Sequence, residues 1–146
     1  MTVIKNYTDI EQSKILAKIL PLESADMCFG INDDTLKYNN LPWLIPYYKY
    51  TAKEFYVPCW SLAKLMILLP SKFTEKGKYS ETTYNIDIRK YALNENTDLY
   101  QIAYGNYKWY EDGNYSWKDM INTGEKENLI DVCYDMIIKL NEQNIL

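Results

Sequence analysis

Apolar residues near the beginning of the chain recur at the spacing of a helix. Residues 8–11 read Thr-Asp-Ile-Glu, the T-x-x-E form of a capping box, in which Thr8 and Glu11 satisfy each other's free backbone N–H groups. The sequence therefore predicts a helix that begins here and ends at Pro21. Its apolar face is formed by Ile15, Leu16, Ile19 and Leu20.

A second helical stripe lies near the end of the chain. Asn122 and Glu125 are expected to cap this helix, and Asp135 and Lys139 stand four residues apart on its outer face, an order that favours an ion pair. The stripe predicts an amphipathic helix packed against a sheet. Its members are Leu129, Val132, Cys133, Met136, Ile137 and Leu140.

Between these helices the pattern changes to short alternating segments and turns. Aromatic and β-branched residues predict strands over 47–51, 54–57, 82–91, 99–104 and 107–110, with Pro58 closing the second and an Asp112-Gly113 turn ending the last. The strands 82–91 and 99–104 are expected to form a hairpin whose loop is too long to fix the register. Residues 30–46 are dense in turn formers and predict a long loop, and residues 23–28 fit either a helical turn or the entry to a strand.

A short apolar segment, residues 59–70, lies between Pro58 and Pro70. Ser61 is a suitable N-cap, and because apolar residues surround the axis we expect an almost wholly buried helix. Helices that bracket a run of strands predict the α+β class. We expect one domain over residues 1–146, with an antiparallel sheet of about four to five strands packed against the three helices.

Composition excludes several kinds of site. The chain has no histidine, the usual general base near neutral pH and a common metal ligand. Its five glycines are isolated, so no phosphate-binding loop can be written. We therefore predict no enzyme activity, no cofactor and no metal site. The weaker candidates for chemistry are the acidic pairs Glu23/Asp26, Asp33/Asp34 and Asp131/Asp135, a calcium-like spacing at Asp112, Asn114 and Ser116, and the thiol of Cys59.

Charge is unevenly distributed along the chain. Residues 111–146 carry 3 lysines against 8 acidic residues, a net charge of −5 in a chain whose total is −4. This acidity and a single arginine, Arg89, disfavour direct binding to nucleic acid. No export signal and no apolar run long enough to span a bilayer are found, which predicts a cytoplasmic protein without a membrane partner.

Tyrosine is the most distinctive residue of the chain, with 15 among 146 residues. Two groups of aromatic residues lie near predicted turns, and Tyr and Trp are typical of the energetically dominant positions of protein interfaces. The first group is Tyr47, Tyr48 and Tyr50; the second is Tyr104, Tyr107, Tyr110, Tyr115 and Trp117. They indicate a surface that binds a protein partner or a second copy of the chain. The alternatives are a small-ligand site of nucleotide type between stacked tyrosines, or ordinary core positions in a tyrosine-rich composition.

Three stretches, residues 11–27, 58–70 and 131–140, together resemble small uncharacterised proteins carried by phages and mobile elements of anaerobic gut bacteria. They cover 40 of the 146 residues and occur in the expected order. The resemblance implies a phage or mobile-element origin, and a bacterial host, but no activity. Before the last helix the chain departs from the pattern, since residues 123–128 replace an expected Asp-x-Pro. The resulting hypothesis is a non-enzymatic accessory protein that binds another protein, such as a host factor.

Overall fold

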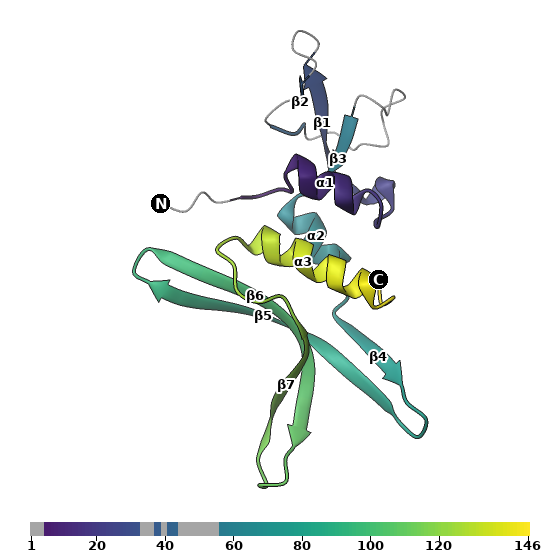
Figure 1. The fold of residues 1–146 in the computed structure, drawn as a ribbon, viewed down its shortest axis with the longest axis vertical. Coiled ribbons are helices and arrows are strands. Elements are labelled where there is room, and N and C mark those ends of the chain that lie inside the picture. The colour runs from purple at the N-terminus through teal and green to yellow at the C-terminus, as the bar shows by residue number, and fades with distance from the viewer. Residues whose placement is uncertain (1–4, 33–36, 39–40, 44–55) are drawn as a thin grey trace. The chain divides into compact units, whose positions relative to one another are not determined.

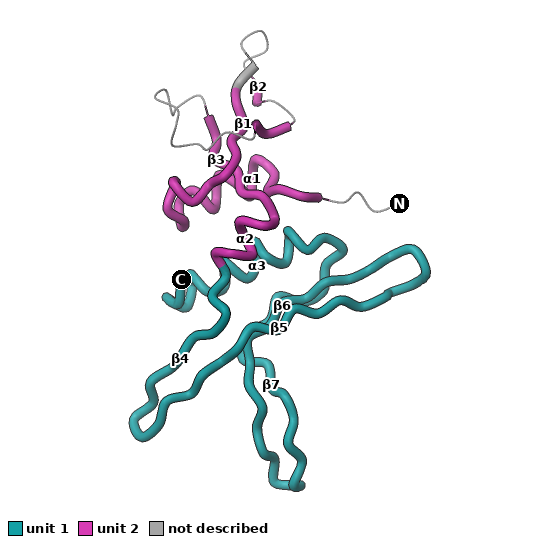
Figure 2. Tube along the Cα trace, turned by 180° about the vertical axis from the view of Figure 1, so that it is seen from behind, with its two compact units in different colours: residues 1–3, 69–146 teal, residues 4–68 magenta. Residues whose placement is uncertain are grey.

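The computed structural model describes residues 5–32, 37–38, 41–43 and 56–146 (Figure 1). The chain divides into two compact units, residues 4–68 and residues 69–146 together with 1–3 (Figure 2). Each unit is described by itself. Helices and antiparallel strands are both present, which confirms the predicted α+β class. Among the described residues no helix has the length and apolar content needed to cross a membrane.

The unit of residues 4–68 combines short helices with a small sheet. Its helical elements are α1 (Ile10–Leu16), the 3₁₀ turn η1 (Leu22–Ser24) and α2 (Leu62–Leu68). Its strands are β1 (Met27–Asn32), β2 (Lys37–Tyr38) and β3 (Tyr56–Cys59), in the antiparallel order β2-β1-β3. Met27, Phe29, Val57 and Cys59 form a buried cluster between β1 and β3.

The first helix exists, but its predicted cap is displaced by one residue. Asp9 is the N-cap: its carboxylate accepts a hydrogen bond from the Gln12 backbone N–H at 2.8 Å, and Gln12 Oε1 accepts from the Asp9 N–H at 3.2 Å. Thr8 is fully buried, and its hydroxyl is within 2.7 Å of Ser13 Oγ and accepts from the Trp60 N–H. The helix begins at Ile10 because the Thr8 hydroxyl is already engaged in the core. Its last residue is Leu16, well before Pro21.

The other predictions for this unit need several corrections. Residues 23–28 form both alternatives in succession, a helical turn and then β1. The expected loop 30–46 contains the end of β1, β2, and a bridge between Cys28 and Trp43. Pro58 does not close a strand but lies within β3, opposite Cys28. The predicted strand 47–51 lies outside the described residues, as do Glu54 and Phe55 of the next one.

Helix α2 is less buried than its apolar composition predicts. Leu65 is fully buried, whereas Ile67 is 75% exposed. Ser61 accepts a hydrogen bond from the Lys64 N–H at 3.2 Å, as an N-cap side chain does. A seven-residue helix makes less than two turns, so its outer residues stay exposed whatever their polarity.

The second unit is built on a four-stranded antiparallel sheet in the order β4-β5-β6-β7. Its strands are β4 (Lys72–Lys76), β5 (Glu81–Asn94), β6 (Thr97–Trp109) and β7 (Tyr115–Asn122). The β5–β6 loop is only Glu95-Asn96, and the ladder through Asn94 and Thr97 fixes the register that the sequence left open. Residues 107–110 are not a separate strand, because β6 runs on to Trp109; β7 was not predicted at all.

Helix α3 (Leu129–Glu142) packs against β6 and covers the core of this unit. The predicted stripe is confirmed for Val132, Cys133, Met136, Ile137 and Leu140, which are all fully buried, whereas Leu129 at its start is half-buried. The predicted ends are wrong. Asn128 rather than Asn122 is the N-cap, although its side chain makes no capping hydrogen bond, and Asp135 pairs with Lys126 at 2.6 Å where the spacing suggested Lys139.

Candidate protein-binding face

Strand β6 changes its neighbours along its length. Its first part, up to Gly105, pairs with β5, and its second part, from Ala103 to Trp109, pairs with β7. Beyond Gly105 the four-stranded sheet therefore forks, and β6 and β7 continue as a two-stranded ribbon that diverges from the β4–β5 hairpin (Figure 1). A bulge at the fork leaves Met120 of β7 without an opposite residue, because Tyr104 pairs with Ile121 and Gly105 with Asp119.

Four aromatic side chains share one face of this ribbon. Tyr107 lies opposite Trp117, and Trp109 lies opposite Tyr115. Because side chains alternate between the two faces of a strand, residues two apart on each strand and their partners all project to the same side. We call Tyr107, Trp109, Tyr115 and Trp117 the aromatic face.

The rings of the aromatic face touch one another but remain open to solvent. Tyr107 stacks on Tyr115 with ring centroids 5.3 Å apart, Trp109 and Tyr115 are 4.8 Å apart, and Tyr107 and Trp117 meet edge to face at 5.5 Å. Trp109 is 73% exposed, Tyr107 58% and Tyr115 56%. Cross-strand aromatic pairs stabilise a ribbon, yet this packing leaves more than half of these three residues in water. A contiguous exposed aromatic surface of this kind is typical of an interaction site.

Trp117 is the inner end of the face and is held by the sheet. Its ring lies across Gly105, where an added Cβ would come within 2.9 Å of the indole and 2.2 Å of the Lys118 carbonyl oxygen. Glycine is therefore required at this position for the ring to lie against the backbone. Trp117 Nε1 donates a hydrogen bond to Asp119 Oδ1 at 2.6 Å, which fixes the orientation of the indole.

Asp119 in turn belongs to a polar network across three strands. The Arg89 guanidinium donates two hydrogen bonds to the Asp119 carboxylate, at 2.9 and 2.6 Å, and further ones to Asp87 at 2.7 Å and Gln101 at 3.1 Å. The Arg89 hydrogen bonds are the main cause that holds the pKa of Asp119 below its ordinary value. The Asp119 hydrogen bonds raise the pKa of Arg89. This bidentate pair joins β5 to β7 and holds the inner end of the aromatic face in one geometry.

The other predicted aromatic residues are distributed differently. Tyr104 is fully buried: its hydroxyl donates to the Pro70 carbonyl oxygen at 2.5 Å, its ring lies 5.3 Å from that of Phe73, and burial raises its pKa. Tyr110 is exposed and begins the turn, where its backbone N–H donates to the Asn114 carbonyl oxygen. Tyr47, Tyr48 and Tyr50 lie outside the described residues. Trp109, the most exposed member of the face, was not among the predicted site residues, although its alternation with Tyr107 is a signal that could have found it.

The weaker chemical candidates are engaged in the structure. Burial raises the pKa of the Cys59 thiol to about 11, the opposite of what a nucleophile needs. Asp26 accepts hydrogen bonds from the Ser61 hydroxyl and N–H at 2.5 and 2.9 Å, and Asp112 accepts from the Asn114 N–H and side-chain amide within the turn. Among the described residues no three Cys, Asp or Glu side chains converge as a metal site would require. Asp33 and Asp34 lie outside them.

No protein-family model, curated protein or solved structure matches the chain. The function is therefore inferred from the geometry of the aromatic face and from the charged residues beside it.

Proposed function

We propose that the protein is a non-enzymatic accessory protein that binds a protein partner through the aromatic face. The observation that carries this proposal is the exposure of Tyr107, Trp109 and Tyr115 in a preformed ladder. Tyr and Trp bury a large area with only two side-chain torsions to fix, so an ordered aromatic ladder costs little conformational entropy on binding. Energetically dominant residues of interfaces are enriched in these two types.

The charges beside the face indicate what kind of surface the partner presents. Glu111 and Asp112 are exposed in the turn that joins β6 to β7, directly after Trp109 and Tyr110. A Lys or Arg side chain of a partner can lie over an exposed indole or phenol ring and pair with a carboxylate of the turn. We therefore propose a partner with a basic contact surface bordered by apolar residues. The net charge of −5 over residues 111–146 supports the same polarity.

Binding of a small ligand between stacked tyrosines is less well supported by the aromatic face. Tyr107 and Tyr115 stack on each other at 5.3 Å and leave no gap for a third ring between them. A base could stack only on the outer sides of the ladder, where it would stay half exposed. A protein surface can cover the whole ladder at once.

The origin and location of the protein belong to the same proposal. The resemblance of residues 11–27, 58–70 and 131–140 to small proteins of phages and mobile elements supports a role in a bacterial host cell. A cytoplasmic host factor is the partner that this origin favours. A second copy of the chain is the other possible occupant, and the experiment below separates the two.

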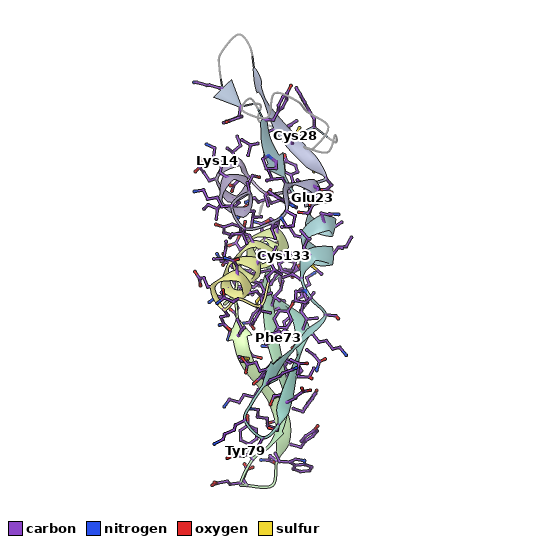
Figure 3. The ribbon with its side chains drawn as sticks, turned by 90° about the vertical axis from the view of Figure 1, so that its right-hand side faces the viewer. Lys14, Glu23, Cys28, Phe73, Tyr79 and Cys133 are labelled. Atoms are coloured by element: carbon purple, nitrogen blue, oxygen red, sulfur yellow. The ribbon has the colours of Figure 1, made fainter. Side chains whose placement is uncertain are left out.

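The test is a quantitative pull-down from a lysate of an anaerobic gut bacterium with the tagged full-length chain. The altered variant carries Trp109→Ser and Tyr115→Ser. The matched control is Tyr79→Ser, because Tyr79 is 89% exposed at the end of the β4–β5 hairpin, on another part of the sheet (Figure 3). All three proteins are expected to remain folded, because the altered variant loses only cross-strand ring contacts, each of which contributes about 0.2–1 kcal/mol.

We expect one stoichiometric partner with the unaltered chain and with the control, and at least about tenfold less with the altered variant, because single dominant residues contribute about 2 kcal/mol or more to an interface. Salt should weaken the complex if the partner is basic. The proposal fails if no stoichiometric partner is captured and sedimentation shows no self-association. It also fails if Tyr79→Ser removes the partner as strongly as the altered variant does. Self-association through the same residues would replace the host factor by a second copy.

A further inference from the structure

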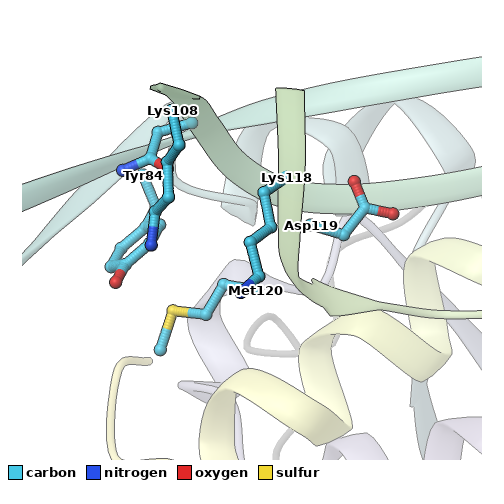
Figure 4. Close-up of a pocket in the computed structure, with 6 residues that line it drawn as sticks. Tyr84, Lys108, Lys118, Asp119 and Met120 are labelled. Atoms are coloured by element: carbon cyan, nitrogen blue, oxygen red, sulfur yellow. The ribbon is translucent and has the colours of Figure 1, made fainter. Parts of the chain in front are cut away.

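The opposite face of the β6–β7 ribbon contains a cleft at the fork of the sheet. Asn85 and Gly105 are the last residue pair between β5 and β6. The next residues along the two strands, Tyr84 of β5 and Asn106 of β6, are no longer paired with each other. The space between them has a volume of about 270 Å³. This is close to the lower end of the range for small-molecule sites. We call it the lysine cleft; its lining is Tyr84, Asn106, Lys108, Lys118, Asp119 and Met120 (Figure 4).

Two positive charges face this cleft from the ribbon. Lys118 lies directly opposite Asn106, and Lys108 is the next residue but one on the same face of β6. Neither ammonium group has an ion-pair or hydrogen-bond partner in the part of the chain that the structure describes. Two unpaired lysines on adjacent strands repel each other. A dianion placed between them would remove that repulsion.

The carboxylates near the cleft do not neutralise these lysines. The Asp119 side chain points away from the other labelled residues in Figure 4, toward its hydrogen bonds with Arg89 and Trp117. Glu75 is hydrogen-bonded to Tyr84, whose pKa is raised by burial and then by this carboxylate. The Tyr84 hydroxyl is thus already hydrogen-bonded to Glu75, and the aromatic ring of Tyr84 lines the cleft.

Asn106 contributes a polar atom without a partner. Its side-chain oxygen Oδ1 is buried, and no donor among the described residues reaches it. A buried acceptor that stays unpaired destabilises the free protein, so a ligand that supplies an N–H or O–H group gains the hydrogen bond without having to break one within the protein. The cleft therefore suits a ligand that carries both a negative charge and a hydrogen-bond donor.

We propose that the lysine cleft binds a small phosphomonoester that also carries a hydrogen-bond donor, with the phosphate between Lys108 and Lys118 and the donor at Asn106. A phosphomonoester has a charge of about −1.5 to −2 at pH 7, which matches two lysines, whereas a carboxylate matches one. Lysine binds phosphate as a point charge and needs no planar fork. This site uses none of the exposed residues of the aromatic face, so it is independent of the proposed protein binding.

Calorimetric titration of the full-length chain at low salt tests the proposal with three probes: inorganic phosphate, adenosine 5′-monophosphate and adenosine. We expect both phosphates to bind, the nucleotide more tightly because its base and ribose supply donors, and adenosine not to bind. Lys108→Gln and Lys118→Gln should each raise the Kd of the nucleotide at least about tenfold, because each removes one charge-assisted contact. Asn106→Leu removes the acceptor for the donor of the nucleotide. It should therefore lower the affinity for the nucleotide toward that for inorganic phosphate.

Two controls make the outcome specific. Lys76→Gln removes an exposed lysine of β4 that does not line the cleft, and it should leave the Kd unchanged. Trp109→Ser with Tyr115→Ser should also leave it unchanged, which separates this site from the aromatic face. The proposal is overturned if neither phosphate binds, if adenosine binds as tightly as its phosphate, or if Lys76→Gln weakens binding as much as the cleft variants do.

Discussion

The two halves of strand β6 use the same residue type in opposite ways. In the inner half Tyr104 is fully buried, and its hydroxyl donates a hydrogen bond to the Pro70 carbonyl oxygen. In the outer half Tyr107 is 58% exposed and lies in the aromatic ladder. The two tyrosines are three residues apart and so project to opposite faces of the strand. Their surroundings, rather than their chemistry, decide whether each tyrosine stabilises the fold or is available to a partner.

The largest expected difference is in the cost of removing each ring. Tyr104→Ala should lower the free energy of unfolding by about 3–5 kcal/mol, because it leaves a large cavity beside Phe73 and an unpaired carbonyl oxygen. Tyr107→Ala should lower it by no more than about 1 kcal/mol, since only cross-strand ring contacts are lost. Urea denaturation of the two variants measures both values. Equal losses would show that the outer half of β6 is part of the core and would break the comparison.

A smaller effect is expected where the two halves meet, at the Arg89–Asp119 pair. Asp119→Asn should destabilise the protein by about 1–2 kcal/mol at pH 7, because hydrogen bonds to a charged partner are weakened. The folded pKa of Asp119 is lowered, so its contribution is present above the ordinary aspartate pKa of about 3.9 and is lost as the pH falls through the folded value.

Stability measured against pH checks this sign. The difference between the unaltered chain and Asp119→Asn should be constant above about pH 5 and should shrink as the pH falls below about 4. Tyr107→Ala changes no carboxylate and provides the control, so its difference from the unaltered chain should stay constant over this pH range. A difference that grows on acidification would contradict the role assigned to the pair.

The elements that the sequence predicted well are those whose periodicity is set by burial on one side. The stripe of α3 is the clearest case, because every fourth or third position faces the sheet. Its cap was wrong because capping depends on local backbone geometry: Asn122 belongs to the end of β7, and its side chain accepts from the Gly124 N–H. The predicted cap at Thr8 was wrong for a similar reason. The Thr8 hydroxyl fits a capping motif, but it is hydrogen-bonded to Ser13 and Trp60 in the core.

The candidate site was predicted only in part. Sequence proximity grouped Tyr104 with Tyr107, but it could not show that the fold buries Tyr104 and leaves Tyr107 exposed. Strand β7 escaped prediction because the bulge at Met120 breaks the alternation between Trp117 and Ile121. The lysine cleft also depends on the fork in the sheet, which arises from long-range strand pairing and cannot be predicted from a local sequence pattern.

The most direct test of the aromatic face as a binding surface is site-specific photo-crosslinking in the bacterial lysate used for the pull-down. The photoreactive residue p-benzoylphenylalanine is introduced in place of Trp109 and, separately, in place of Tyr79. At position 109 we predict a single crosslinked adduct of defined mass with a basic protein. This adduct should not form when the lysate is irradiated at high salt, and no such adduct should form at position 79. Adducts of the same pattern at both positions, or none at position 109, would contradict the account.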